Sequence, residues 1–138
     1  MKKKLDWQIE FHKFIDENKF KGFKWGSWDC CKFANACIKA MTGEDLIPKE
    51  LSWKNEEEAL KSIKDYGGTL KNSIKKASKK KNLLEIDLDH LQIGDLVVYK
   101  EESQLVGIYD GNFVLTHTDN KLGVVKNANI LSAWRIDG

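Results

Sequence analysis

The stretch that decides the fold covers residues 95–118 and reads DLVVYKEESQLVGIYDGNFVLTHT. Short runs of Val, Ile, Leu and Tyr alternate in it with turn residues, and the same pattern continues to residue 136. Such runs predict strands near 95–100, 105–110, 113–118, 122–126 and 132–136. The breaks at Asp110-Gly111-Asn112 and Asp119-Asn120 have hairpin-type turn residues, so we expect neighbouring strands to be antiparallel. The C-terminal half is therefore predicted to be an antiparallel β-meander.

The N-terminal half has apolar residues at helical spacing instead. The pattern predicts helices at 6–19, from a cap at Ser27 or Asp29 to about Met41, from about Asn55 to Gly67-Gly68, and at 70–80. In the third helix, Leu60 and Ile63 are expected to face the core. Helices that precede a meander indicate an α+β domain in which the N-terminal helices pack on one face of the sheet. A chain of 138 residues suffices for one core, so residues 1–138 are predicted to form a single domain.

Charge and composition limit the partners. The formal net charge is +2, from 23 basic and 21 acidic side chains, and so small a surplus means that nucleic acid is not expected as a partner. The segment from Lys71 to Lys81 contains six lysines and no acidic residue. A run of this kind is more often a solvated helix face than a binding patch, and its role stays open. No apolar run follows the basic start Met1 to Lys4, so neither a signal peptide nor a membrane span is expected.

The cysteines suggest a nucleophile. Cys30, Cys31 and Cys37 lie within eight residues, which does not fit a disulfide framework. Cys30 is placed at the start of the second helix, where unpaired N–H groups and the helix dipole lower a thiol pKa. It shares a helix stripe with Phe33 and Cys37, whereas Cys31 is rotated by about 100°. Cys30 is thus expected to face the sheet. The alternative is that all three thiols are small buried hydrophobic groups.

A nucleophilic cysteine needs a base, and His117 is the histidine placed to supply one from the sheet. Its orientation depends on the hairpin loop before it. If the loop is the three residues 111–113, Gly107 pairs with His117, and both share one face of the hairpin with Leu105. If the loop has two residues, His117 points the other way. The sequence leaves both alternatives open.

A metal site is the other chemistry that these residues could support. The three cysteines with His12, His90 or His117 could in principle supply four ligands. The spacing lacks the C-x₂₋₄-C knuckle of common zinc sites, and adjacent cysteines on a helix diverge. No metal and no other cofactor is expected.

Three segments resemble the conserved boxes of NlpC-like peptidoglycan endopeptidases, which are papain-like cysteine hydrolases. They are Asp29-Cys30-Cys31-Lys32-Phe33, Leu91 to Tyr99, and Val106 to Gly111. A likeness over nearly the whole chain is to an NlpC-like group found in phage and prophage tail gene clusters. It rests on Phe23-Lys24-Trp25-Gly26, the doubled cysteine, Met41 to Asp45, Gly67-Gly68, and Ala133 to Ile136. The resemblance implies a papain-like fold in which Cys30 is the nucleophile.

The resemblance also implies a departure at the base. In active endopeptidases the general-base histidine directly precedes the Val-Gly-Ile-Tyr segment, and this chain has Leu105 there. An aliphatic side chain cannot accept a proton. The ungapped count from Leu105 puts His117 at the residue that orients the base in the family. Asp29, Trp28 and Trp25, around the nucleophile, are the expected binding residues.

Three functions are consistent with this pattern. The first is a divergent, non-catalytic NlpC-like domain of phage or prophage origin, associated with a tail or its assembly, since fold does not fix function. The second is an active cysteine peptidase or amidase that cleaves peptidoglycan peptides through Cys30 with His117. The third is a small phage accessory protein that binds a host factor. The expected partners are a phage tail or host protein or a peptidoglycan peptide, and the expected location is the bacterial cytoplasm or the phage particle.

Overall fold

The structure is a computed structural model that describes residues 1–118 and 121–137. Within these residues four α-helices come first: α1 (Trp7–Asn18), α2 (Cys30–Thr42), α3 (Glu56–Tyr66) and α4 (Leu70–Lys80). The strands follow: β1 (Leu84–Ile86), β2 (Leu96–Lys100), β3 (Gln104–Tyr109), β4 (Val114–Thr116), β5 (Gly123–Val125) and β6 (Ile130–Arg135), with a short 3-10 helix η1 (Leu88–His90) between β1 and β2. The predicted α+β class is confirmed.

The sheet has the strand order β1-β6-β2-β3-β4-β5, and each pair of neighbours is antiparallel. The meander prediction is therefore correct for β2 to β5 and wrong for the last strand. Instead of extending the meander beyond β5, β6 returns to pair with β2, and β1, which the sequence pattern had not indicated, pairs with its outer side. The turn predicted at Asp119-Asn120 lies outside the described residues.

Local capping explains where α2 begins and ends. The Asp29 side chain accepts a hydrogen bond from the Lys32 N–H, so Asp29 rather than Ser27 is the N-cap. At the other end Gly43 adopts a φ of 85° and donates its N–H to the Lys39 carbonyl. Both ends of α2 are thus fixed by the sequence next to them, and the N-terminal one sets the position of Cys30.

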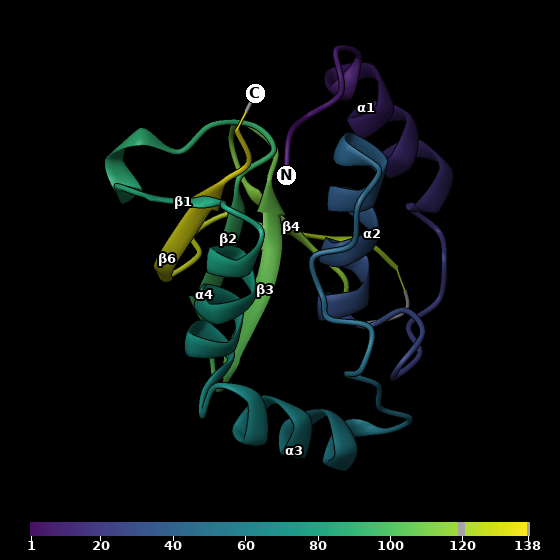
Figure 1. The fold of residues 1–138 in the computed structure, drawn as a ribbon. Coiled ribbons are helices and arrows are strands. Elements are labelled where there is room, and N and C mark those ends of the chain that lie inside the picture. Colours follow the sequence, from purple (N-terminus) through teal and green to yellow (C-terminus); the bar gives the residue numbers. More distant parts are fainter. Residues whose placement is uncertain (119–120, 138) are drawn as a thin grey trace.

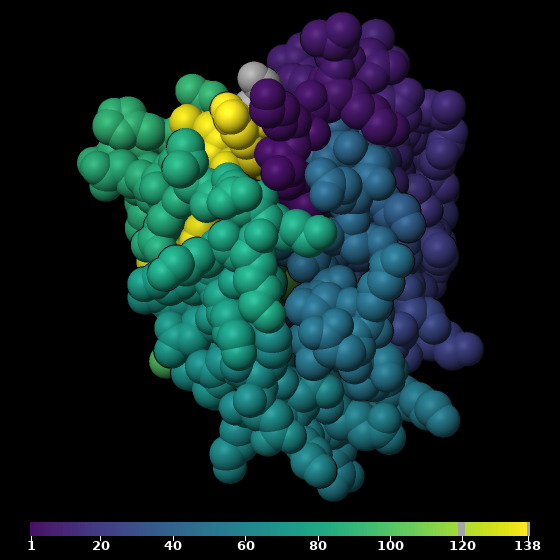
Figure 2. Space-filling view, in the orientation of Figure 1, coloured from purple at the N-terminus to yellow at the C-terminus, as the bar shows by residue number. Residues whose placement is uncertain are grey.

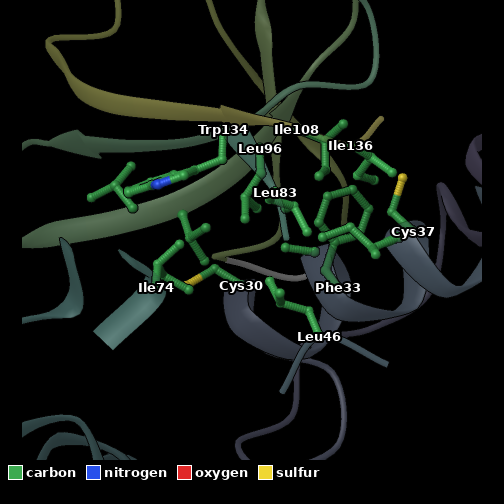
Figure 3. Packing of buried hydrophobic residues seen from close by; sticks show 14 of the residues in the cluster. Cys30, Phe33, Cys37, Leu46, Ile74, Leu83, Leu96, Ile108, Trp134 and Ile136 are labelled. Carbon is green, nitrogen blue, oxygen red and sulfur yellow. The ribbon is translucent and has the colours of Figure 1, made fainter. Parts of the chain in front are cut away.

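Helices α2 and α4 cover the same face of the sheet, and the main core lies between these helices and the sheet (Figures 1 and 3). Figure 3 shows Cys30, Phe33 and Cys37 of α2 directed toward this core, together with Ile108 of β3 and Trp134 of β6. The stripe predicted for the second helix is confirmed by the burial of these three residues. The opposite face of the sheet has a smaller cluster that consists of Val97, Tyr99, Val114 and Ala133.

Helix α3 lies across the lower ends of α2 and α4 (Figure 1), and the segment of residues 46–53 packs beside α4 along the seam in Figure 2. The expectation that Leu60 faces the core is wrong, because its side chain is 58% exposed and Ala59 is buried instead. Ile63 does pack against the core. None of the helices in the described part of the chain combines the length and the apolar character that crossing a membrane requires.

Candidate functional site

A cleft of about 310 Å³ opens beside Cys30. Its walls come from the N-terminus of α2, from α3, from the turn before α4 and from the start of β3. The residues that line it are Trp25, Asp29, Cys30, Cys31, Trp53, Glu56, Ala59, Leu60, Ile63, Gly68, Thr69, Leu70, Ser103, Gln104 and Leu105. Most of these contribute apolar surface, and the volume is at the lower end of the range for small-ligand sites.

Asp29 organises one end of the cleft. Its carboxylate is 1% exposed and accepts three hydrogen bonds. The donors are the Lys32 N–H at 2.9 Å, the Gly26 N–H at 2.9 Å and the Trp53 indole Nε1–H at 2.6 Å. Because these donors belong to α2, to the loop before it and to the loop before α3, one carboxylate connects three segments of the cleft wall.

The Cys30 thiol is buried, with 9% of the residue exposed, and sits between α2 and β3. A hydrogen bond from the Cys31 side chain lowers the pKa of Cys30 most, and the backbone N–H groups of Val106 and Cys31 lower it further. Burial and the negative charge of Asp29 oppose them, but the net direction is down. The contact with Val106 of β3 agrees with the predicted orientation of Cys30 toward the sheet.

The two other thiols are less acidic. The hydrogen bond that Cys31 gives to Cys30 raises the pKa of Cys31 well above its ordinary value, and burial adds to the shift. Cys31 also lines a separate apolar cavity of about 50 Å³. Cys37 is fully buried, and burial alone raises its pKa. Cys30 is therefore the one of the three whose environment favours the thiolate.

Leu105, at the position where the resemblance places a base, lines the cleft together with Cys30. The register of β3 and β4 decides how His117 lies relative to it. Tyr109 pairs with Val114, and the Asp110 N–H donates to the Phe113 carbonyl, so the hairpin loop has two residues. Continued along the strands, this register sets Val106, not Gly107, opposite His117. Of the two alternatives left open by the sequence, the structure has the one in which His117 points away from the side of Leu105.

His117 is fully buried in a different environment. Its ring packs among the rings of Phe23, Trp28 and Phe33, with centroids 6.0 to 6.3 Å away. Its Nε2 lies 2.5 Å from the Lys21 carbonyl, which can only accept, so Nε2 carries the proton. Its Nδ1 is buried without a hydrogen-bond partner among the described residues. His117 thus connects β4 to the loop before α2, and it is not among the residues that line the cleft.

The structure brings Cys30, Asp29 and Trp25 together at the cleft and separates Trp28 from them. Trp28 is 6% exposed and packs against Phe14, Phe33 and His117 in the core. Among the described residues there is no group of three or more His, Cys, Asp or Glu side chains that could hold a metal ion.

The chain matches the family described as "Domain of unknown function (DUF6950)" over residues 2–136. The chain belongs to this family. No curated protein matches it. The match extends from before α1 to the end of β6, so the DUF6950 domain includes every wall of the cleft.

Several cleft residues of this DUF6950 domain had not been indicated by the sequence, namely Trp53, Glu56, Leu60, Thr69, Ser103 and Gln104. They lie on α3, on loops and at the start of β3, 23 to 74 residues after Cys30 in the sequence, so only the fold brings them near it. One signal was present: Trp53 is a large aromatic residue in a loop, where burial on a helix or strand face cannot explain it. For the polar residues the local sequence carries no distinguishing pattern.

Proposed function

We propose that this chain is a divergent, papain-like domain of the NlpC type, of phage or prophage origin, that binds a peptide segment of a tail or tail-assembly protein without hydrolysing it. The binding site is the cleft beside Cys30. The observation that carries the proposal is the leucine at position 105 of the cleft, where a hydrolase of this type has its base.

Hydrolysis of an amide by a cysteine nucleophile requires a group that takes the thiol proton and returns it to the leaving group. Among the described residues that line the cleft there is no histidine. Asp29 is 1% exposed and already accepts from three donors, so its carboxylate serves the structure of the cleft wall. Leu105 cannot exchange a proton. The lowered pKa of Cys30 favours its thiolate. Glu56, the other carboxylate of the described lining, is exposed at the start of α3 and is not among the groups that shift the pKa of Cys30, so neither a histidine nor a carboxylate is placed to return the proton to the leaving group.

The same cleft suits a peptide. Its lining is largely apolar, with Ala59, Leu70 and Leu105, and includes two half-buried tryptophans, Trp25 and Trp53. Tryptophan supplies a large rigid contact area at small entropic cost, which is why it is enriched in binding sites. A largely apolar lining with two tryptophans therefore suits an apolar side chain of a bound peptide.

The test is incubation of the purified chain with peptidoglycan stem peptides, with mass spectrometric analysis of the products. The proposal predicts no cleavage and an identical product pattern for the wild type and Cys30→Ser. Cleavage by the wild type that is lost in Cys30→Ser would overturn it.

A second candidate is the active cysteine peptidase or amidase, and the observation that favours it is that the hydrogen bond from Cys31 lowers the pKa of Cys30. In that function Cys30 attacks an amide carbonyl and His117 serves as base. This function requires that the His117 side chain move out of its aromatic surroundings, or that its Nδ1 take the Cys30 proton from within the core beneath α2. The third function is the binding of a host factor by a phage accessory protein, and it would use the same cleft. Isolation of the partner distinguishes it from the first function, because the partner is then a host protein and not a tail protein.

A further inference from the structure

We infer that the cleft beside Cys30 binds a peptide segment in which a lysine or arginine lies next to an apolar residue, with the cation held between Trp25 and Glu56. The inference rests on the proposed function, because it names the class of peptide that the same cleft takes.

The charge of the cleft lining favours a cation. Of the described side chains that line it, Asp29 and Glu56 are carboxylates, and no lysine or arginine is among them. Asp29 is 1% exposed and accepts from three donors, so it contributes negative potential rather than an oxygen that a ligand can reach. Glu56 is exposed at the first turn of α3 and has no ion-pair partner within the described residues. It is therefore the carboxylate that a ligand can reach.

Three of the five tryptophans of this protein already have a cation over the ring. Lysine ammonium groups lie over the rings of Trp7 at 4.0 Å, Trp28 at 4.0 Å and Trp53 at 4.7 Å. Trp25 lines the cleft, is half-buried, and has no such cation among the described side chains. The Phe23 ring packs edge-to-face against the Trp25 ring, with the centroids 5.1 Å apart. A cation over an aromatic face is attracted by the ring quadrupole, and indole is the strongest acceptor.

Lys32 restricts where the cation can sit. Its ammonium group lies over the ring of Trp53, and Lys32 lines a neighbouring groove rather than the cleft. A second cation at Trp53 would be repelled by it. The remaining aromatic surface of the cleft with a carboxylate in the same lining is Trp25 with Glu56.

The rest of the cleft selects the neighbour of the cation. The apolar part of the lining includes Leu105, Leu70 and Ala59 together with the exposed Leu60. An apolar side chain that follows the cation gains contact there, because it leaves water for a hydrophobic wall. The expected ligand is thus cationic and apolar in adjacent positions.

The experiment titrates the whole chain with three peptides: acetyl-Leu-Lys-Leu-amide, the same peptide with uncharged norleucine for lysine, and the same peptide with glutamate. Binding is followed by tryptophan fluorescence, and the site is located by protection of Cys30 from iodoacetamide. The lysine peptide should bind about fivefold more tightly than the norleucine peptide, as expected for one ion pair with a cation–π contact. The glutamate peptide should bind most weakly.

Two variants provide a matched pair. Glu56→Gln should remove most of the preference for lysine over norleucine. Glu57→Gln, in the same first turn of α3 but outside the cleft lining, should change it by less than about twofold. Equal binding of the lysine and norleucine peptides, with Cys30 protected by both, would overturn the charge preference and leave peptide binding by the cleft intact. If no peptide protects Cys30, the inference is overturned and the proposed cleft fails with it.

Discussion

The three hydrogen bonds of Asp29 make it the residue whose replacement should test the site most sharply. We predict that Asp29→Asn lowers the free energy of unfolding by about 3 kcal/mol. The amide has nearly the shape of the carboxylate, so the substitution changes hydrogen bonding and charge without leaving a cavity. The three donors that surround the buried side chain belong to Gly26, Lys32 and Trp53.

The magnitude follows from these donors. An asparagine has one acceptor oxygen, so its NH₂ group must face an N–H donor in either orientation. In the cheaper orientation the oxygen keeps Gly26 and Trp53, and the lost cap at Lys32 costs about 1 kcal/mol. The two remaining bonds change from a charged to a neutral acceptor, which costs about 1 kcal/mol each. The sum is about 3 kcal/mol.

The assay is urea unfolding followed by far-UV circular dichroism, with Thr69→Ala as the matched control. Thr69 caps α4 through the Asn72 N–H alone, so its replacement should cost about 1 kcal/mol. The slope of the unfolding transition should be the same for all variants. An Asp29→Asn variant that is destabilised no more than Thr69→Ala would refute the role of Asp29 in joining three segments.

Three further predictions concern the same region. Iodoacetamide should modify Cys30 at lower pH than Cys31, because the hydrogen bond between them lowers the pKa of Cys30 and raises that of Cys31; peptide mass spectrometry at stepped pH checks the order. Gly107→Ala should lower the free energy of unfolding by about 2 kcal/mol, because the added Cβ would lie 2.5 Å from the Leu115 carbonyl oxygen of β4. Gly22→Ala should be nearly neutral in urea unfolding, because a Cβ there has no atom within 4 Å, and equal effects of the two substitutions would contradict this. Leu105→His should raise the alkylation rate of Cys30 near neutral pH by at least about threefold, by supplying an imidazole in the cleft; an unchanged rate would mean that position 105 does not reach the thiol.

Helix positions could be predicted because their signals are local. The cap at Asp29, the apolar stripe through Cys30 and the glycine stop at Gly43 all lie within one segment, and the structure has each of them. The prediction that Leu60 is buried was wrong for a physical reason. Only part of the surface of α3 packs against the rest of the protein, and the neighbouring Ala59 has the buried position. Local periodicity cannot show which side of a helix has a partner.

Strand order and side-chain direction depend on long-range pairing instead. The return of β6 to β2 joins residues more than 30 positions apart, and β1 is only three residues long. For His117 the difference of one residue in the hairpin loop reverses the face of the sheet to which the side chain points. The sequence could reduce that question to two alternatives, and the pairing of Tyr109 with Val114 decides it.

His117 is buried among aromatic rings, and the proposed function requires that it exert no chemistry on Cys30. The most direct test measures the rate of Cys30 alkylation by iodoacetamide against pH in the wild type and in His117→Gln, whose amide can still donate to the Lys21 carbonyl. We predict that the two pH profiles superimpose within about twofold, with circular dichroism confirming the fold of both. A rate between about pH 6 and 7 that falls at least about fivefold in the folded variant would contradict the claim and identify His117 as the base of a working cysteine hydrolase.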